Sequence, residues 1–219
     1  LACKEGLKVK LNVYEDKGAL MEKLGNMMAD EVIEHNQKGI PTKWVLPAGP
    51  TDEYDIFVRR VNEERISLKN LWIFHMDEFL DWEGRPLPVA DTYESLEGIW
   101  PRIDNIDYAD NLCEELGGVD TVWAGVGATG LVAFNEAPRN YCYRLTVDEY
   151  AQGKTRIVEL NDDSMVAMAH RSFGCCLDRI PPKAITLGFK VMLSAKRCVY
   201  MVGTGPWKQT VCRIILFSE

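Results

Sequence analysis

Apolar segments that run directly into glycine or carboxylate junctions constrain the fold of this chain more than any other feature. The segment from Asn70 to Phe74 is almost continuously apolar and is followed by His75-Met-Asp-Glu-Phe79. The segment from Val119 to Ala124 runs into a turn with three glycines. Strands of this composition are typically buried on both faces by flanking helices. Because parallel strands end at a common edge of their sheet, we expect a ligand site at that edge.

Strand and helix patterns alternate along the rest of the chain. Apolar residues recur at helical spacing between residues 17 and 35, and acidic residues begin a second helical segment at residue 52. Three more short segments, 43–46, 184–187 and 198–202, have the apolar composition of strands. The alternation predicts βαβ units and an α/β fold with a mostly parallel sheet. With no internal repeat or linker, we expect one domain over residues 1–219. The expected helices are 17–35 and 52–62, and the additional strands are 43–46, 184–187 and 198–202.

Two regions have weaker patterns. Residues Leu7 to Val13 alternate between apolar and polar side chains, which predicts a strand with one solvated face near a sheet edge. Between Trp82 and Asp120 several prolines interrupt the pattern, and only Thr92 to Ile99 is expected to be helical.

Composition narrows the compartment and the partners. Apolar content of 47% and charged content of 26% are ordinary for a soluble globular protein. There is no apolar run of the roughly 18 residues that a membrane helix needs, and the N-terminus lacks a signal-peptide apolar region. A cytoplasmic protein without membrane partners is therefore expected. The net charge of -8 argues against nucleic acid but leaves a small anionic ligand open.

The seven cysteines lack Cys-x-x-Cys spacing, so free thiols in a reducing compartment are expected. Only three histidines are present, none at ligand spacing from a cysteine, and zinc is not expected.

Two strand ends carry candidate site residues. Leu46-Pro-Ala-Gly-Pro-Thr51 joins a strand to a helix, where Ala48, Gly49 and Thr51 could hold a phosphate; an ordinary βα turn is the alternative. Asp77 and Glu78 follow a buried strand, where desolvation would raise a carboxyl pKa and suit a general base. A solvated loop or a helix N-cap is the alternative for this pair.

Further candidates lie at the later strand ends. Gly125, Gly127 and Gly130 would let the backbone approach a ligand closely, and Glu136 ends the same turn. Arg171 lies in a helical stretch and Lys208 follows a glycine turn, and each alone could be a solvated surface charge.

In this order the motifs resemble the glucosamine-6-phosphate deaminase/isomerase family, which shares its fold with the 6-phosphogluconolactonases. The resemblance runs from about Leu7 to Lys208 and implies a modified Rossmann-like, three-layer fold. It implies a small-molecule sugar phosphate as ligand, no metal or organic cofactor, and leaves a homo-oligomer open. By the same resemblance Asp77 removes the proton at the sugar C2, and Arg171 and Lys208 hold the 6-phosphate.

The chain departs from the family at the ring-opening loop. The family uses the His of Gly-x-Asp-Gly-His, oriented by the Asp of that motif and by the Glu of Phe-Asn-Glu. Here Thr129 and Leu131 stand at the Asp and His positions, and only Glu136 remains. In the phosphate turn Pro50 lacks an N–H, and Asp52 replaces the usual proline with a negative charge.

These departures leave three functions open. The first is an amino-sugar 6-phosphate deaminase/isomerase with Asp77 as base, in which ring opening is spontaneous or uses Glu136 with water, His75 or His170. The second is a non-catalytic sugar-phosphate-binding relative, and the third, less favoured, is a 6-phosphogluconolactonase. The segment between Ile106 and Val119 and the part after Phe217 are shorter than in the family; a loss and missing residues are both open.

Overall fold

A computed structural model describes residues 9–47, 49, 52–87, 99–136, 144–203 and 205–217. The strands form two sheets. Sheet A has the order β2-β1-β4-β7, and all its pairs are parallel; its members are β1 (Thr42–Leu46), β2 (Leu71–His75), β4 (Thr121–Gly125) and β7 (Arg197–Met201). Sheet B has the order β3-β6-β5, and both its pairs are antiparallel; its members are β3 (Asp77–Leu80), β5 (Arg156–Glu159) and β6 (Lys183–Thr186).

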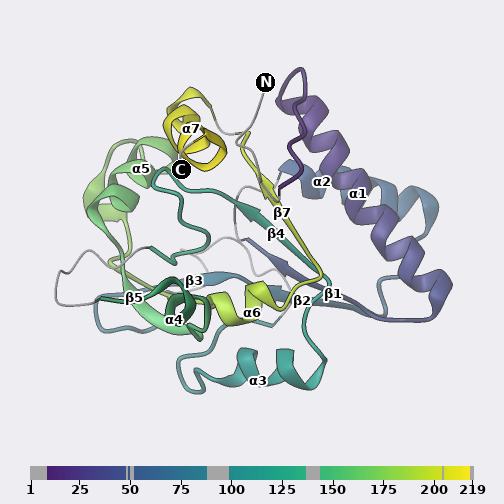
Figure 1. Cartoon of the computed structure of the whole chain (residues 1–219), viewed down its shortest axis with the longest axis horizontal. Coiled ribbons are helices and arrows are strands. Elements are labelled where there is room, and N and C mark those ends of the chain that lie inside the picture. Colours follow the sequence, from purple (N-terminus) through teal and green to yellow (C-terminus); the bar gives the residue numbers. More distant parts are fainter. Residues whose placement is uncertain are drawn as a thin grey trace.

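Helices cover both faces of sheet A. Figure 1 shows α1 and α2 on one side and α3 on the other. The helices are α1 (Lys17–Lys38), α2 (Asp52–Glu64), α3 (Tyr108–Glu115), α4 (Val147–Ala151), α5 (Asp162–Ser172), α6 (Phe189–Leu193) and α7 (Gln209–Phe217), with short 3₁₀ turns η1 (Leu177–Arg179) and η2 (Pro206–Lys208). The three-layer α/β architecture expected from the sequence is confirmed.

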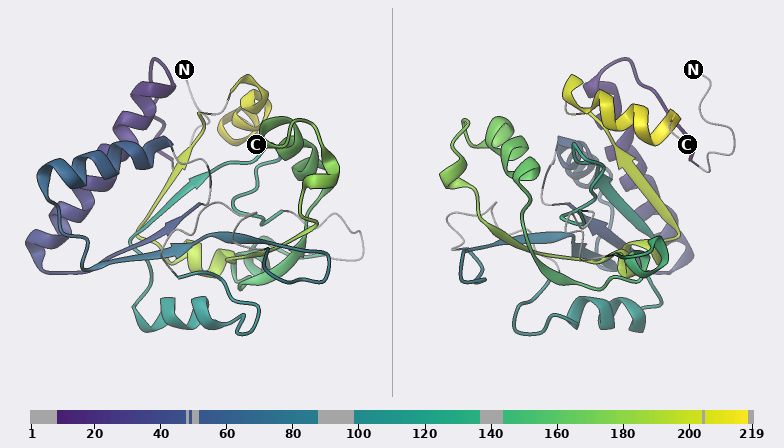
Figure 2. Two further views of the ribbon diagram at one scale, coloured as in Figure 1. Left: turned by 180° about the vertical axis from the view of Figure 1, so that it is seen from behind. Right: turned by 60° about the vertical axis from the view of Figure 1, so that its left-hand side comes forward.

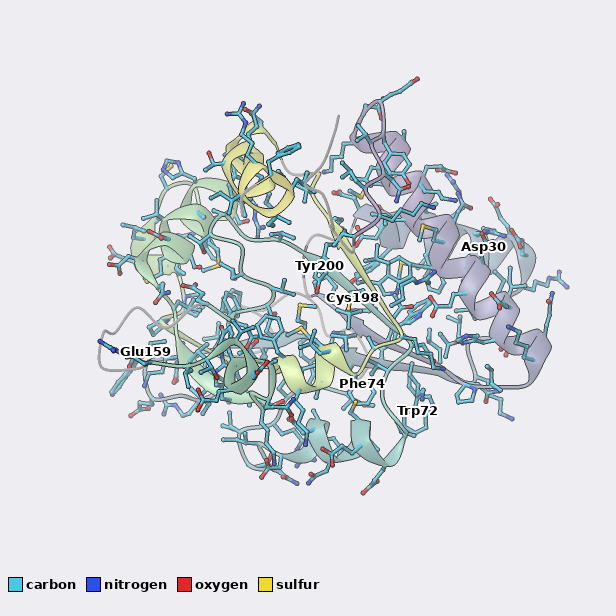
Figure 3. All side chains as sticks on the ribbon, in the orientation of Figure 1. Asp30, Trp72, Phe74, Glu159, Cys198 and Tyr200 are labelled. Atoms are coloured by element: carbon cyan, nitrogen blue, oxygen red, sulfur yellow. The ribbon has the colours of Figure 1, made fainter. Side chains whose placement is uncertain are left out.

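The two faces of sheet A build two separate cores. Trp44 and Trp123 meet edge to face, with ring centroids 5.9 Å apart, and pack against α1 and α2. Residues one position along the same strands point to the other face, as strand geometry requires, and pack against α3 and α6. Phe74 and Cys198 belong to this second core, whereas Asp30 lies on the solvent side of α1 (Figure 3). Strand β4 therefore has the two-sided burial that the sequence predicts, whereas β2 lies at the edge of the sheet and leaves Trp72 39% exposed, so the prediction is wrong for that strand.

Sheet B was not expected. The sequence predicts that residues 184–187 belong to the parallel sheet, but β6 pairs antiparallel with both β3 and β5. Strands β3 and β5 begin or end with charged residues, so their sequences lack the apolar pattern from which a strand is predicted. Figure 2 shows α5 over one side of this sheet, while α3 lies on the far side of the molecule.

Met76 joins the two sheets. Its N–H donates to the Leu46 carbonyl of β1 at 2.9 Å, and its carbonyl accepts from the Leu187 N–H, after β6, also at 2.9 Å. The side chain is almost completely buried. The chain thus leaves sheet A after His75 and enters sheet B at Asp77, which fixes Asp77 at the boundary of both sheets.

The predictions for the two weaker regions fare differently. Residues 9–13 form no strand, because Val9, Leu11 and Val13 are all exposed and no face of the segment is buried. Residues 92–98 of the expected helix lie outside the described ranges, and Ile99 pairs with β2 instead of being helical. The sequence also missed α3, a short helix that packs under sheet A.

Among the described residues, no helix is long and apolar enough to cross a membrane. All the cysteines that the structure describes are free thiols.

Candidate functional site

A cavity of about 160 Å³ opens where the strands of sheet A end. Its wall contains the residues after β1, β2 and β4, one face of α5, and the η2 turn after β7. Six of the candidate site residues line it: Gly49, Asp77, Gly125, Gly127, Arg171 and Lys208. The convergence of strand ends thus brings together residues that are up to 159 positions apart in the chain.

Asp77 is the cavity carboxylate with the most perturbed acidity. It is the first residue of β3, opposite Thr186 of β6. Burial raises its pKa to about 7, and the negative charge of Glu78 adds to the effect. A carboxyl group with this pKa is ionised about half the time at neutral pH and binds a proton strongly enough to act as a general base.

Glu78 does not line the cavity. It lies one residue further along β3, so its side chain points to the other face of the strand. Its Oε1 accepts a hydrogen bond from the Phe79 N–H at 2.7 Å, and burial raises its pKa. Its effect on the site is electrostatic, through the pKa of Asp77.

The loop after β4 forms a closed turn over the cavity. The Gly127 N–H donates to the Leu131 carbonyl at 2.8 Å, and Gly130 has a φ of 93°, which favours glycine. The Leu131 side chain lies directly over Gly127: a Cβ atom there would be 2.5 Å from Leu131 Cγ. Leu131 therefore fills this part of the wall with an apolar group that has no proton to transfer, and Thr129 lines the cavity nearby.

Glu136 lies behind the wall rather than in it. Its Oε1 accepts a hydrogen bond from the Ser164 hydroxyl in the first turn of α5. The preceding residue, Asn135, is buried and holds the loop: its amide donates to the Leu187 carbonyl at 2.7 Å and accepts from Arg156 at 2.7 Å. The end of the loop is therefore fixed to both strands β5 and β6.

Two cations face the cavity from different elements. Arg171 is in the last turn of α5, and Lys208 is the last residue of η2. Lys208 is only 5% exposed; burial lowers its pKa, and the charge of Arg171 lowers it further. Within the described residues neither cation forms an ion pair, so a bound anion would relieve their mutual repulsion.

The turn after β1 is only partly described. Pro47 and Gly49 line the cavity, while Ala48, Pro50 and Thr51 lie outside the described residues, and the phosphate contacts expected of Ala48 and Thr51 stay predictions. The Asp52 carboxylate pairs with Lys17 of α1 at 2.6 Å, which partly compensates its negative charge.

Sequence reasoning missed several polar residues of this region, among them Tyr54 and Ser164. The Tyr54 hydroxyl donates to the Pro47 carbonyl at 3.0 Å and braces the turn; burial raises its pKa well above the usual value, and the charges of Glu53 and Asp77 add to this. Ser164 lines the cavity and bonds Glu136. A helix-spaced face of α5 that ends at Arg171 is the signal that would have found Ser164.

Two histidines considered for proton transfer lie elsewhere. His75 is buried and stacks on Trp100, with ring centroids 3.7 Å apart. His170 is exposed, and its Nδ1 lies 3.5 Å from the Cys175 sulfur. Within the described part of the chain neither histidine lines the cavity. In the same ranges, groups of three or more His, Cys, Asp or Glu side chains suited to a metal ion are absent.

Comparison with known protein sequences identifies relatives of this chain. No protein-family model matches the chain. A glucosamine-6-phosphate deaminase from Clostridium botulinum (strain Eklund 17B / Type B) is 33% identical over 220 residues, which cover 90% of this chain and 80% of that protein. A glucosamine-6-phosphate deaminase from Caenorhabditis elegans is 27% identical over 222 residues, which cover 91% of this chain and 78% of that protein.

Solved structures agree on the fold. A monomeric glucosamine-6-phosphate deaminase has a TM-score of 0.67 and 21% identity, covering 88% of this chain and 81% of the other. A 6-phosphogluconolactonase from Shewanella baltica has a TM-score of 0.53 and 16% identity, and the match covers 91% of this chain and 83% of the other.

Fold and cavity together define an α/β protein with a cavity at the carboxyl edge of its parallel sheet, the position at which open α/β sheets bind small molecules. By its similarity to the Clostridium protein over most of both sequences, the chain belongs to the glucosamine-6-phosphate deaminase family.

Proposed function

We propose that this protein binds a hexosamine 6-phosphate and catalyses its aldose–ketose isomerisation with loss of the amino group. One observation carries the proposal: a carboxyl group with a pKa of about 7 shares a cavity with two cations that form no ion pairs among the described residues. Asp77 removes the proton from C2 and delivers it to C1. Arg171 and Lys208 hold the phosphate, and Gly49 leaves open space beside them in the cavity wall.

The proton transfer agrees with the electrostatics of the site. A base that is ionised at neutral pH but still basic gives the best rate for proton abstraction next to a carbonyl. Burial, which raises the pKa of Asp77, also strengthens its interactions with charges that develop on the substrate. Glu78 assists by keeping that pKa high.

The reaction is tested by incubating the protein with glucosamine 6-phosphate and measuring ammonia and ketose 6-phosphate together. Both products are expected in equal amounts, and Asp77→Asn is expected to abolish them while ligand binding, followed by calorimetry, persists. Equal product formation by wild type and Asp77→Asn would remove Asp77 from the mechanism.

A non-catalytic sugar-phosphate-binding protein is the second candidate. Leu131 favours it, since the leucine packs over Gly127 and supplies no acid or base for opening the sugar ring. Under this alternative glucosamine 6-phosphate binds, but neither product forms in the assay above.

A further inference from the structure

A single hydroxyl group connects the Glu136 carboxylate to the cavity. Glu136 lies behind the wall, whereas Ser164, whose hydroxyl bonds to Glu136 Oε1, lines the cavity. The other carboxylate oxygen, Oε2, is buried and accepts no hydrogen bond within the described residues. The Ser164 hydroxyl therefore stands between a buried proton acceptor and the space available to a ligand.

The pair is held in place from three sides. The Tyr150 hydroxyl donates to the backbone carbonyl of Glu136 at 2.6 Å, and the amide of Asn135 fixes the preceding residue. Ser164 is in the first turn of α5, where the helix dipole favours the negative charge of a nearby carboxylate. A proton relay needs this kind of fixed geometry, because each transfer occurs only at hydrogen-bond distance.

Helix α5 also sets the distance between the two ends of a bound sugar phosphate. Ser164 and Arg171 line the same cavity from one face of the helix. They are seven residues apart, which corresponds to about 10 Å of helix rise. A sugar whose phosphate contacts Arg171 would extend along α5 and place its carbonyl end near Ser164.

We propose that Ser164 relays protons between Glu136 and the hemiacetal oxygens of the bound sugar, and so opens its ring. The proposal rests on the proposed function, because hexosamine 6-phosphates are cyclic in solution and C2 deprotonation needs the open-chain form. It adds a catalytic residue for the ring-opening step, for which Leu131 has no group that can transfer a proton.

The relay conserves protons and electrons. The Ser164 hydroxyl passes its proton to Glu136 and takes the proton of the sugar O1–H. The O1 electron pair forms the C1=O1 bond as C1–O5 breaks, and the proton on Glu136 returns through Ser164 to O5. Because O1 and O5 are bonded to the same carbon, one hydroxyl group can reach both. Glu136 begins and ends as a carboxylate.

Ring opening is measured directly as the interconversion of the α and β anomers of glucosamine 6-phosphate by proton exchange NMR. The Asp77→Asn protein isolates this step, because C2 deprotonation is blocked. We expect it to accelerate interconversion above the rate in buffer, and added Ser164→Ala to reduce the protein's contribution by roughly 10²-fold or more. Ser164→Thr, which keeps the hydroxyl group, is expected to retain activity.

Glu136→Gln provides a second variant that keeps the shape of the pair but cannot accept the proton. It is expected to lose the acceleration as Ser164→Ala does. Unchanged interconversion in both variants would overturn the proposal, as would an Asp77→Asn protein that gives no acceleration. Failure of the wild type to exchange the C2 proton would contradict the proposed function instead. The rate of anomer interconversion would still test the role of Ser164 independently.

Discussion

At the scale of single residues, adjacent carboxylates have different surroundings. Asp77 faces the cavity, whereas Glu78 points to the other side of β3 and accepts the Phe79 N–H. Both lose hydration, and the repulsion between them raises the pKa of Asp77 further. In the proposed function the two residues therefore have different roles: Asp77 contacts the ligand, and Glu78 raises the pKa of Asp77.

This division predicts a pH dependence for removal of the C2 proton. Only the ionised form of Asp77 is a base, so the exchange rate is expected to rise through about pH 7 and level off above it. Glu78→Gln removes a charge that raises the pKa of Asp77, so the midpoint is expected to move to lower pH. Exchange of the C2 proton, measured between pH 5 and 9 in both proteins, tests this; a midpoint that Glu78→Gln leaves in place would contradict it.

The sequence predicted the site residues at strand and helix ends better than those that are placed by packing. Asp77, Arg171 and Lys208 are recognisable beside strand or helix ends, where topology brings them together. The contact of Ser164 with Glu136 joins segments 28 positions apart in the chain, whereas Tyr54 bonds to Pro47 only seven positions away. The helical spacing of α5 indicates the face that carries Ser164, but no local pattern encodes its contact with Glu136.

At the scale of elements, helix α2 buries a carboxyl group against α1. Glu53 is 1% exposed, and within the described residues neither of its carboxylate oxygens accepts a hydrogen bond. The helices approach closely here: a Cβ atom on Gly25 of α1 would be 2.8 Å from the Glu53 carbonyl oxygen. Burial raises the pKa of Glu53 to about 7, with a contribution from Asp52 that Lys17 opposes.

Glu53 is therefore expected to make the fold less stable as the pH rises. The folded protein holds the Glu53 proton more tightly than the unfolded chain, so stability is lost between about pH 4.5 and pH 7. Glu53→Gln is expected to increase the free energy of unfolding at pH 8 by up to about 3 kcal/mol and to change it little at pH 4. Urea unfolding at both pH values measures the difference. Equal differences at both values would contradict this account.

The elements also show where sequence patterns suffice. The four strands of sheet A contain apolar runs from which they were predicted, although the edge strands β2 and β7 leave Trp72 and Tyr200 exposed. β3 and β5 have only four residues each and carry charges, so their pairing with β6 is set by tertiary structure. Conversely, the alternating segment 9–13 has a strand pattern but finds no surface to bury.

At the scale of the whole molecule, the cavity lies at the junction of the two sheets. Met76 carries the chain from one sheet to the other, and the candidate ligand contacts come from both sides of this junction. Asp77 and Arg171 belong to sheet B and its helix, whereas Gly127 and Lys208 follow strands of sheet A. A bound sugar phosphate would therefore connect the two halves of the fold.

Ligand binding is accordingly expected to stabilise the folded protein. At a glucosamine 6-phosphate concentration 100 times the Kd, the free energy of unfolding should rise by about 2.7 kcal/mol. Lys208→Met should lose most of this increase at the same concentration, while Lys190→Met, which removes an exposed lysine paired with Glu114, should keep it. Urea unfolding with and without ligand measures both. An equal increase in the two variants would contradict the assignment of Lys208 to the phosphate.

Exchange of the substrate C2 proton with solvent tests the central claim most directly. Glucosamine 6-phosphate is incubated with the protein in D₂O, and the C2–H signal is followed by proton NMR for the wild type and for Asp77→Asn. We expect the signal to disappear with the wild type and to persist with Asp77→Asn, although both proteins broaden the ligand resonances. A persistent C2–H signal with a wild type that binds the ligand would contradict the account and identify a sugar-phosphate-binding protein without isomerase activity.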